Sequence, residues 1–206
     1  ISSFDPYWDE DQCNRSVHGA PAQAALKLER SSKQTSVTLV DVSCSGATVA
    51  KGILGSQYRG LPTQIESVSE IVGDREIDAV VMTIGGNDVG FATILTTCAL
   101  QANCPLAEAT SAPLSNFPTI AAGVQDLTAG LASSYAAINT CFTDSSCEGT
   151  QGQKLPGLSL GKKGSVFLNS YPDLARSQTG EVCSYITITE EDFRWAQDSI
   201  LNPNPT

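Results

Sequence analysis

The chain is poor in histidine and in basic residues. It has one histidine, His18, and one methionine, and no two of its seven cysteines are spaced as Cys-x-x-Cys. We therefore predict no zinc site, since such a site needs several thiolate or imidazole ligands, and nothing in the composition implies another metal or a cofactor. Only 12 basic residues stand against 22 acidic ones, giving a formal net charge of -10. That balance argues against nucleic acid or an anionic membrane surface as the main partner.

Long hydrophobic runs are also missing. No stretch approaches the roughly 20 apolar residues that a membrane-spanning helix needs, and Ile1 does not begin a signal peptide, which suits a mature or trimmed chain. Seven cysteines in 206 residues indicate an oxidising compartment and so a secreted protein. The length fits a single domain covering residues 1–206.

One segment points to catalysis. The apolar run Ile77–Ile84 reads as a buried strand of a parallel sheet, and a helix is predicted over Asp88–Cys98. Between them, Gly85 and Gly86 allow a sharp turn and a close approach to a ligand, and Asn87 offers an uncharged amide donor. This arrangement can supply half of an oxyanion hole. The structural alternative is a glycine turn in which Asn87 and Asp88 cap the next helix.

A second segment has the same organisation. Ser36–Val42 is another pattern typical of a buried strand, and it leads directly into the small residues of Ser43–Thr48. Gly46 lies in this second turn, where its backbone N–H can face a ligand.

Together these segments resemble the SGNH hydrolases (GDSL-type esterases and lipases), and within them the secreted, disulfide-bonded branch typified by actinobacterial lipases. The sequence SCSGAT is similar to that family's second block, and TIGGNDVGFA to its third. The resemblance implies that the Gly46 N–H and the Asn87 side chain form the oxyanion hole. Further matching stretches are Cys13–Ser16 (CNRS), Gln64 at the start of a helix, and Val166–Leu174 (VFLNSYPDL).

The chain departs from the family pattern at both ends. The family's nucleophile is a serine in a GDS-type motif upstream of the CNRS stretch, and its base is a histidine in an Asp-x-x-His pattern near the carboxyl terminus. Neither motif occurs in this chain, and His18 matches no catalytic position. We therefore expect a sequence trimmed at both ends, whose parent protein supplies the nucleophilic serine and the base.

The cysteines predict disulfides. Cys98 and Cys104 bracket one short loop, and Cys141 and Cys147 bracket another. The resemblance implies a third pair, Cys13 with Cys44. Cys183 is then left over; the family pairs it with a cysteine farther downstream, and a free thiol or an intermolecular link are the alternatives.

Alternating helices and strands predict an α/β fold, a three-layer α/β/α sandwich with a parallel sheet. The resemblance implies the flavodoxin-like strand order 2-1-3-4-5, with the first strand missing from the chain and the ligand site beside it. Leu100–Asn116 and Glu148–Lys163 read as surface excursions. The remaining predicted elements are a helix over Ala20–Glu29, a helix after Pro62, a helix from near Pro118 with an apolar stripe to Ile138, a strand over Ser165–Leu168, and a final helix capped by Thr189.

The function predicted from these patterns is a serine ester hydrolase acting on a small-molecule, lipid or carbohydrate ester. Three alternatives remain open. One is a complete enzyme that uses Ser43 or Ser45 with His18 as base; another is an inactive SGNH-like domain that binds a glycan or protein; the third is a structural cell-surface domain. The acyl-chain specificity and the oligomeric state cannot be read from the sequence.

Overall fold

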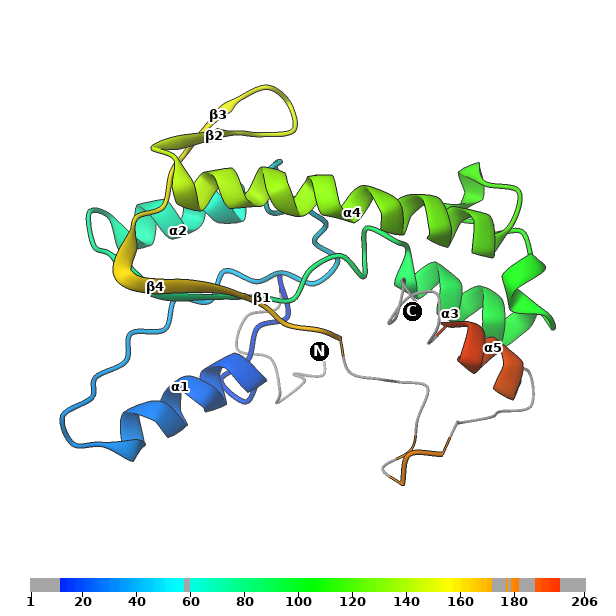
Figure 1. Cartoon of the computed structure of the whole chain (residues 1–206), viewed down its shortest axis with the longest axis horizontal. Helices are drawn as coiled ribbons and strands as arrows, with labels where there is room; N and C mark the ends of the chain where they lie inside the picture. The colour runs from blue at the N-terminus through cyan, green and yellow to red at the C-terminus, as the bar shows by residue number, and fades with distance from the viewer. Residues whose placement is uncertain (1–11, 58–59, 172–176, 178, 182–187, 197–206) are drawn as a thin grey trace, which may run out of the picture. The chain divides into compact units, whose positions relative to one another are not determined.

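A computed structural model describes residues 12–57, 60–171, 177, 179–181 and 188–196 (Figure 1). Its elements make a mixed α/β chain, and the three-layer sandwich stays a prediction. The helices are α1 (Ala20–Ser31), α2 (Gln64–Val72), α3 (Phe91–Leu100), α4 (Ile120–Thr143) and α5 (Glu190–Ala196). The strands are β1 (Ile77–Met82), β2 (Ser146–Glu148), β3 (Lys154–Pro156) and β4 (Leu160–Leu168), and short 3₁₀ turns cover Cys104–Leu106 and Leu114–Asn116.

Strands β1 and β4 pair in parallel and lie side by side in Figure 1. The Ile77 N–H donates to the Ser159 carbonyl at 2.8 Å, and the Asn169 N–H donates to the Met82 carbonyl at 2.8 Å. Both strands therefore begin at one end of the ladder and finish at the other. The predicted strand Ser165–Leu168 is confirmed and extends back to Leu160.

The strand predicted over Ser36–Val42 is wrong, because this segment has no strand structure. A strand exists only where a neighbouring backbone accepts and donates its hydrogen bonds, and no strand in the described part of the chain pairs with this segment.

The prediction that the strand over Ile77–Ile84 is buried in a covered sheet is also wrong. Val81 of β1 is 57% exposed and Phe167 of β4 is 52% exposed. Among the described residues, β1 and β4 are the two strands of this sheet, so neither has a strand on its other edge there. Apolar character alone therefore did not determine burial here.

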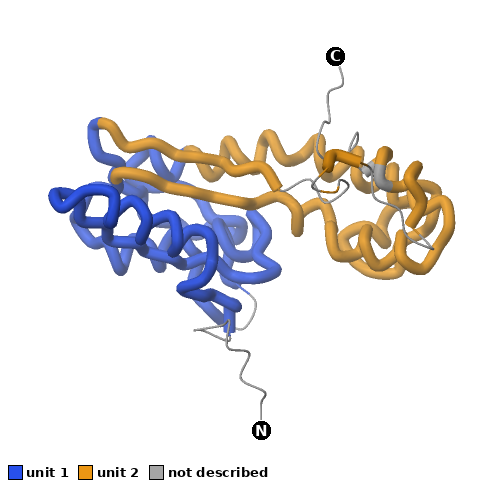
Figure 2. Tube along the Cα trace, turned by 90° about the horizontal axis from the view of Figure 1, so that it is seen from below, with its two compact units in different colours: residues 1–77, 140–162 blue, residues 78–139, 163–206 orange. Residues whose placement is uncertain are grey.

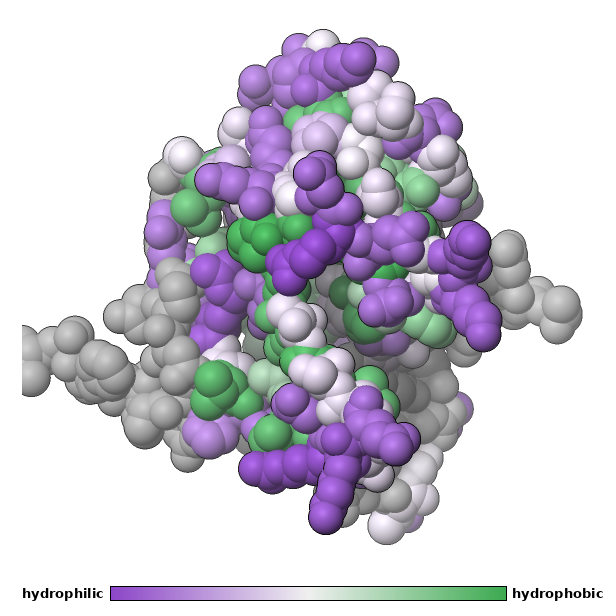
Figure 3. Space-filling view, turned by 90° about the vertical axis from the view of Figure 1, so that its left-hand side faces the viewer, coloured by the Kyte–Doolittle hydropathy of each residue, from purple (hydrophilic) through white to green (hydrophobic). Residues whose placement is uncertain are grey.

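By its internal contacts the chain divides into two units, coloured separately in Figure 2. Unit 1 consists of residues 1–77 and 140–162, and unit 2 of residues 78–139 and 163–206. Figure 3 displays one face of the molecule, on which apolar residues are interspersed with polar ones.

In unit 1, β2 and β3 form an antiparallel pair in which Cys147 lies opposite Leu155. Leu155 and Leu158 are buried, so the prediction that Glu148–Lys163 is a surface excursion is wrong. Residues 149–153 connect β2 to β3, and the buried leucines that follow contribute to the core. The other buried apolar residues in the described part of unit 1 are Cys13, Ala47, Val49, Ile53, Leu54, Ile65, Cys141 and Cys147.

Unit 2 has its core between α3, α4 and the segment that joins them. Cys104 and Leu114 of that joining segment are fully buried, so Leu100–Asn116 is not a surface excursion. They pack in one cluster with Ile94 of α3 and with Ile120 and Val124 of α4. A segment rich in Pro, Ser and Thr can still contribute to a core through a few apolar side chains, although Leu106 of the same segment is 65% exposed.

The predicted disulfides Cys98–Cys104, Cys141–Cys147 and Cys13–Cys44 are confirmed. Cys183 lies outside the described residues. Three disulfides are compatible with an extracellular protein. No helix in the described part of the chain is long and apolar enough to cross a membrane.

Two predicted helix starts are confirmed by their caps. Thr189 caps α5: its Oγ1 accepts from the Asp192 N–H at 3.2 Å, and Asp192 Oδ2 accepts from the Thr189 N–H at 2.9 Å. Asp192 Oδ1 also accepts from the Cys104 N–H at 3.0 Å, which links the cap to the disulfide turn. Gln64 opens α2, and Thr63 forms a capping box with Glu66.

The Thr63 cap gives a stability prediction. Thr63 is buried, and its Oγ1 accepts from the Glu66 N–H at 3.0 Å. Thr63→Ala should lower the free energy of unfolding by about 1 kcal/mol, because a buried donor loses its acceptor, whereas Thr63→Ser keeps the hydroxyl and should lose less. Urea unfolding measures both, and equal losses in the two variants would contradict the capping role.

Candidate functional site

The glycine turn after β1 lies wholly in unit 2. Residues 85–90 form turns, and α3 begins only at Phe91. The helix predicted from Asp88 is therefore three residues too long at its start. Gly90, with φ +77°, is the N-cap, and no side chain caps this helix, so Asp88 does not have the predicted capping role. A left-handed Gly90 redirects the chain before the helix can form.

Two tyrosines hold this turn. The Tyr135 hydroxyl, from α4, donates to the Ile84 carbonyl at 3.1 Å. The Tyr171 hydroxyl, from the segment that follows β4, accepts from the Gly86 N–H at 3.1 Å. The turn is thus bonded to a helix and to the loop after the neighbouring strand.

The two glycines are required by these contacts. A Cβ atom at Gly85 would lie 2.5 Å from the Tyr135 hydroxyl oxygen, and its φ of +113° disfavours other residues. A Cβ atom at Gly86 would lie 2.8 Å from Cζ of Tyr171. Both distances are far below van der Waals contact. The sequence pattern Gly-Gly therefore reflects close packing by two rings as well as a sharp turn.

The electrostatics favour a neutral Tyr135. Burial raises the pKa of the Tyr135 phenol above its ordinary value, and the Asp88 carboxylate and Tyr171 raise it further. A negative charge on the phenol would be poorly solvated and would be repelled by Asp88. Tyr135 consequently keeps its proton and remains a hydrogen-bond donor to Ile84.

Asn87 is exposed at the edge of this turn. Its backbone carbonyl accepts from the Gly90 N–H at 3.1 Å, which fixes the peptide that follows it. The side chain is therefore accessible to a molecule in solution and extends from a restrained backbone.

The second predicted donor, Gly46, lies in unit 1 on a loop with several restraints. The Cys13–Cys44 disulfide joins this loop to the CNRS stretch, and the Ser45 N–H donates to the Cys13 carbonyl at 3.1 Å. Arg15 Nη1 donates to the Ser43 carbonyl at 3.2 Å. The three residues before Gly46 are therefore each held by a bond to the CNRS stretch.

The N–H of Gly46 differs from those of its neighbours. The Ser45 N–H is bonded to Cys13, and the Ala47 N–H donates to the Cys44 carbonyl at 3.1 Å. The Gly46 N–H has no acceptor among the described residues. Gly46 is exposed, its φ is +78°, and no atom lies within 4 Å of the place that a Cβ would occupy. A backbone donor here is open to an external acceptor.

Gly46 belongs to unit 1 and Asn87 to unit 2. The convergence of these two donors on one oxyanion pocket stays a prediction. Each donor by itself has the exposure and the local restraint that the role demands.

The alternative of a complete enzyme based on His18 gains no support. His18 is exposed, and its only hydrogen bond in the described part of the chain is from its backbone N–H to Ser16 Oγ at 3.1 Å. The Ser43 hydroxyl donates to Asp41 Oδ1 at 2.7 Å. The Ser43 hydroxyl thus donates its hydrogen bond to a carboxylate and not to an imidazole.

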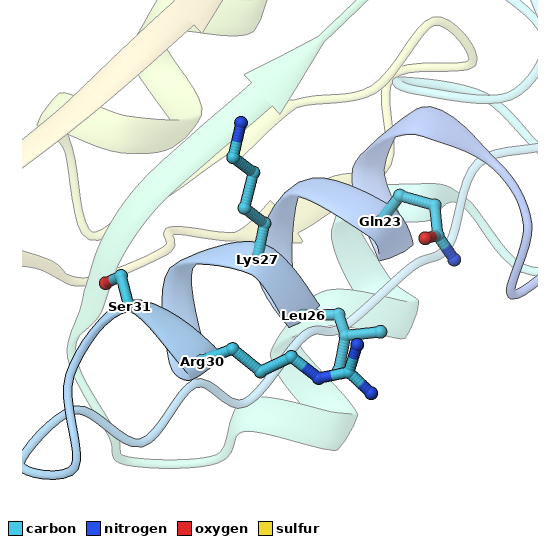
Figure 4. A pocket seen from close by; sticks show the side chains of 5 residues that line it. All are labelled: Gln23, Leu26, Lys27, Arg30 and Ser31. Atoms are coloured by element: carbon cyan, nitrogen blue, oxygen red, sulfur yellow. The ribbon is translucent and has the colours of Figure 1, made fainter.

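A hollow on α1 is not organised as a binding site. It is lined by residues of this one helix, which has no buried residue, and Figure 4 shows that the side chains of Lys27 and Arg30 point in different directions. In the part of the chain that the structure describes, no three His, Cys, Asp or Glu residues are grouped to hold a metal ion.

Sequence reasoning missed the roles of Tyr135, Tyr171 and Arg15. Tyr135 lies in the predicted apolar stripe that runs to Ile138, and a stripe pattern carries no information about a hydroxyl partner. Tyr171 follows the carboxyl end of a predicted strand, where side chains of parallel sheets meet a ligand site, and that position was the available signal. Comparison with protein-family models, with curated proteins and with solved structures gives no match.

The environment of Tyr135 predicts a dependence of stability on pH. Its pKa is raised on folding, so it stabilises the fold below the unfolded pKa of about 10, and this contribution is lost as the pH rises through the folded pKa. Above pH about 10, the wild-type free energy of unfolding should therefore fall more steeply than that of Tyr135→Phe. Urea unfolding at several pH values measures the difference, and parallel curves would contradict it.

Proposed function

We propose that this chain carries the oxyanion-stabilising part of a serine ester hydrolase. The Gly46 N–H and the Asn87 carboxamide are the two donors, and the nucleophilic serine and the base histidine are supplied by residues outside these 206. The observation that carries the proposal is the Gly46 N–H. It lacks an acceptor among the described residues, although the N–H groups on either side of it are bonded.

The chemistry follows from where charge develops. When a serine oxygen attacks an ester carbonyl, its proton passes to the histidine, and the carbonyl oxygen becomes negative in the tetrahedral intermediate. Collapse of that intermediate breaks the bond to the alcohol, which leaves with the proton from the histidine. Donors already aimed at the carbonyl oxygen stabilise the intermediate without having to reorganise.

The restraints on each donor support this assignment. A donor that moves freely loses most of its advantage, because solvent and its own motion compete with the oxyanion. Gly46 is restrained by the Cys13–Cys44 disulfide and the Arg15 bond, and Asn87 stands on a turn that two tyrosines hold.

The strand arrangement also supports it. Strands β1 and β4 are parallel neighbours, as the third and fourth strands of the order 2-1-3-4-5 would be. In that order Asn87 would follow the third strand, which lies next to the strand that ends in the nucleophile. The substrate is an ester of a small molecule, lipid or carbohydrate, hydrolysed outside the cell, and the chemistry requires no metal or cofactor.

The proposal predicts a large kinetic effect at Asn87. In the complete natural protein, Asn87→Ala should lower kcat for p-nitrophenyl butyrate by about 100- to 1000-fold, because one oxyanion donor is lost. Far-UV circular dichroism should be unchanged, since the side chain is exposed.

Asn116→Ala is the matched control, because it removes the same side chain from another exposed position. It should retain wild-type kcat. A loss of less than tenfold in Asn87→Ala would refute the donor role. A complete protein that has no serine and histidine to do the chemistry, and no esterase activity, would instead favour the inactive glycan- or protein-binding domain.

A further inference from the structure

We infer that Tyr135 and Tyr171 are positioning residues, which together fix the backbone on both sides of Gly85 and thereby aim the Asn87 side chain. The inference rests on the proposed function for its catalytic consequence, but the clamp itself is a property of the fold. The inference explains why tyrosine, and not phenylalanine, occupies these two positions.

The two bonds act on adjacent peptide groups. Tyr135 bonds to the Ile84 carbonyl, which belongs to the peptide before Gly85, and Tyr171 bonds to the Gly86 N–H, which belongs to the peptide after it. Glycine has the widest backbone freedom of any residue, so an unrestrained Gly85 would let the following residues swing. Holding both flanking peptides fixes φ and ψ of Gly85.

The positions of the two tyrosines follow from the fold of unit 2. The Asn169 N–H donates to the Met82 carbonyl at 2.8 Å, which keeps the β4 chain beside the β1 chain past the end of the ladder. Two residues later, the Tyr171 ring reaches Gly86. Tyr135 approaches from α4, where the neighbouring Leu131 side chain also contacts the position at which a Gly85 Cβ would lie.

The hydroxyls have complementary roles. Tyr135 donates and Tyr171 accepts, and each bond would be lost in the corresponding phenylalanine, which keeps the ring. Tyr171 is 38% exposed, so its ring remains partly accessible to solvent while its hydroxyl bonds to Gly86. Removal of either hydroxyl should therefore loosen the turn without opening a cavity in the core.

The first experiment measures the clamp directly on the 206-residue chain. In ¹⁵N-labelled protein, Tyr171→Phe should speed hydrogen exchange of the Gly86 amide by about tenfold, as expected for the loss of one hydrogen bond, and should shift the Asn87 side-chain amide resonances. Ser133→Ala is the control, because it removes an exposed hydroxyl of α4 that bonds to Gly130 within the helix. An unchanged Gly86 exchange rate in Tyr171→Phe would overturn the inference.

The second experiment tests positioning in the complete natural protein with p-nitrophenyl butyrate. Tyr135→Phe and Tyr171→Phe should each lower kcat by roughly tenfold with little change in KM, since binding in the ground state does not use the aimed amide. In an Asn87→Ala background neither should cause a further loss, because the group that they aim is absent. Losses that add fully in that background would overturn the positioning role.

The experiments distinguish failure of the proposed function from failure of the positioning role. If Asn87→Ala leaves kcat unchanged, the proposed function fails, while the Gly86 exchange rate still decides whether the clamp exists. If Asn87→Ala is strongly impaired and both tyrosine variants keep wild-type kcat, the proposed function stands and the positioning role is refuted.

Discussion

The parallel pairing of β1 with β4 is the constraint on which the organisation of unit 2 depends. Because the two strands run in the same direction, the segments that follow them emerge at the same end of the ladder. The glycine turn follows β1 and Tyr171 follows β4, so a contact between residues 85 positions apart becomes local in space. An antiparallel pair would have placed Tyr171 at the opposite end, and the turn would lack one of its two restraints.

In unit 1 the backbone around Gly46 is also restrained, but by different interactions. In the described part of the chain no strand pairs with the loop around Gly46, and a disulfide, an arginine and a backbone hydrogen bond supply the restraint instead. Both candidate donors thus combine exposure with a fixed backbone. This combination is unusual for exposed turns, which are normally mobile, and it is the physical argument for a role in binding developing negative charge.

Local patterns in the sequence predicted local structure well. The apolar stripe of α4, the Thr189 cap of α5 and the disulfides between cysteines six residues apart all depend on neighbours along the chain. The errors have a common cause. Ser36–Val42 has the composition of a strand but no partner, and Leu114 lies in a polar segment but is fully buried. Pairing and burial depend on residues distant in sequence, which no local pattern contains.

The sequence by itself determined the types of residue at the candidate site: glycines that allow sharp turns, an asparagine with an amide to donate, and cysteines that can link the loops. It also determined that no second histidine is present. Only the tertiary structure decided that the Gly46 N–H is left without an acceptor among the described residues while its neighbours are bonded, and that Tyr135 and Tyr171 grip the peptides beside Gly85. Hydrogen-bond partners are chosen by position in space, and a tyrosine in an apolar stripe reveals nothing of its hydroxyl's partner until the helix and the turn are brought together.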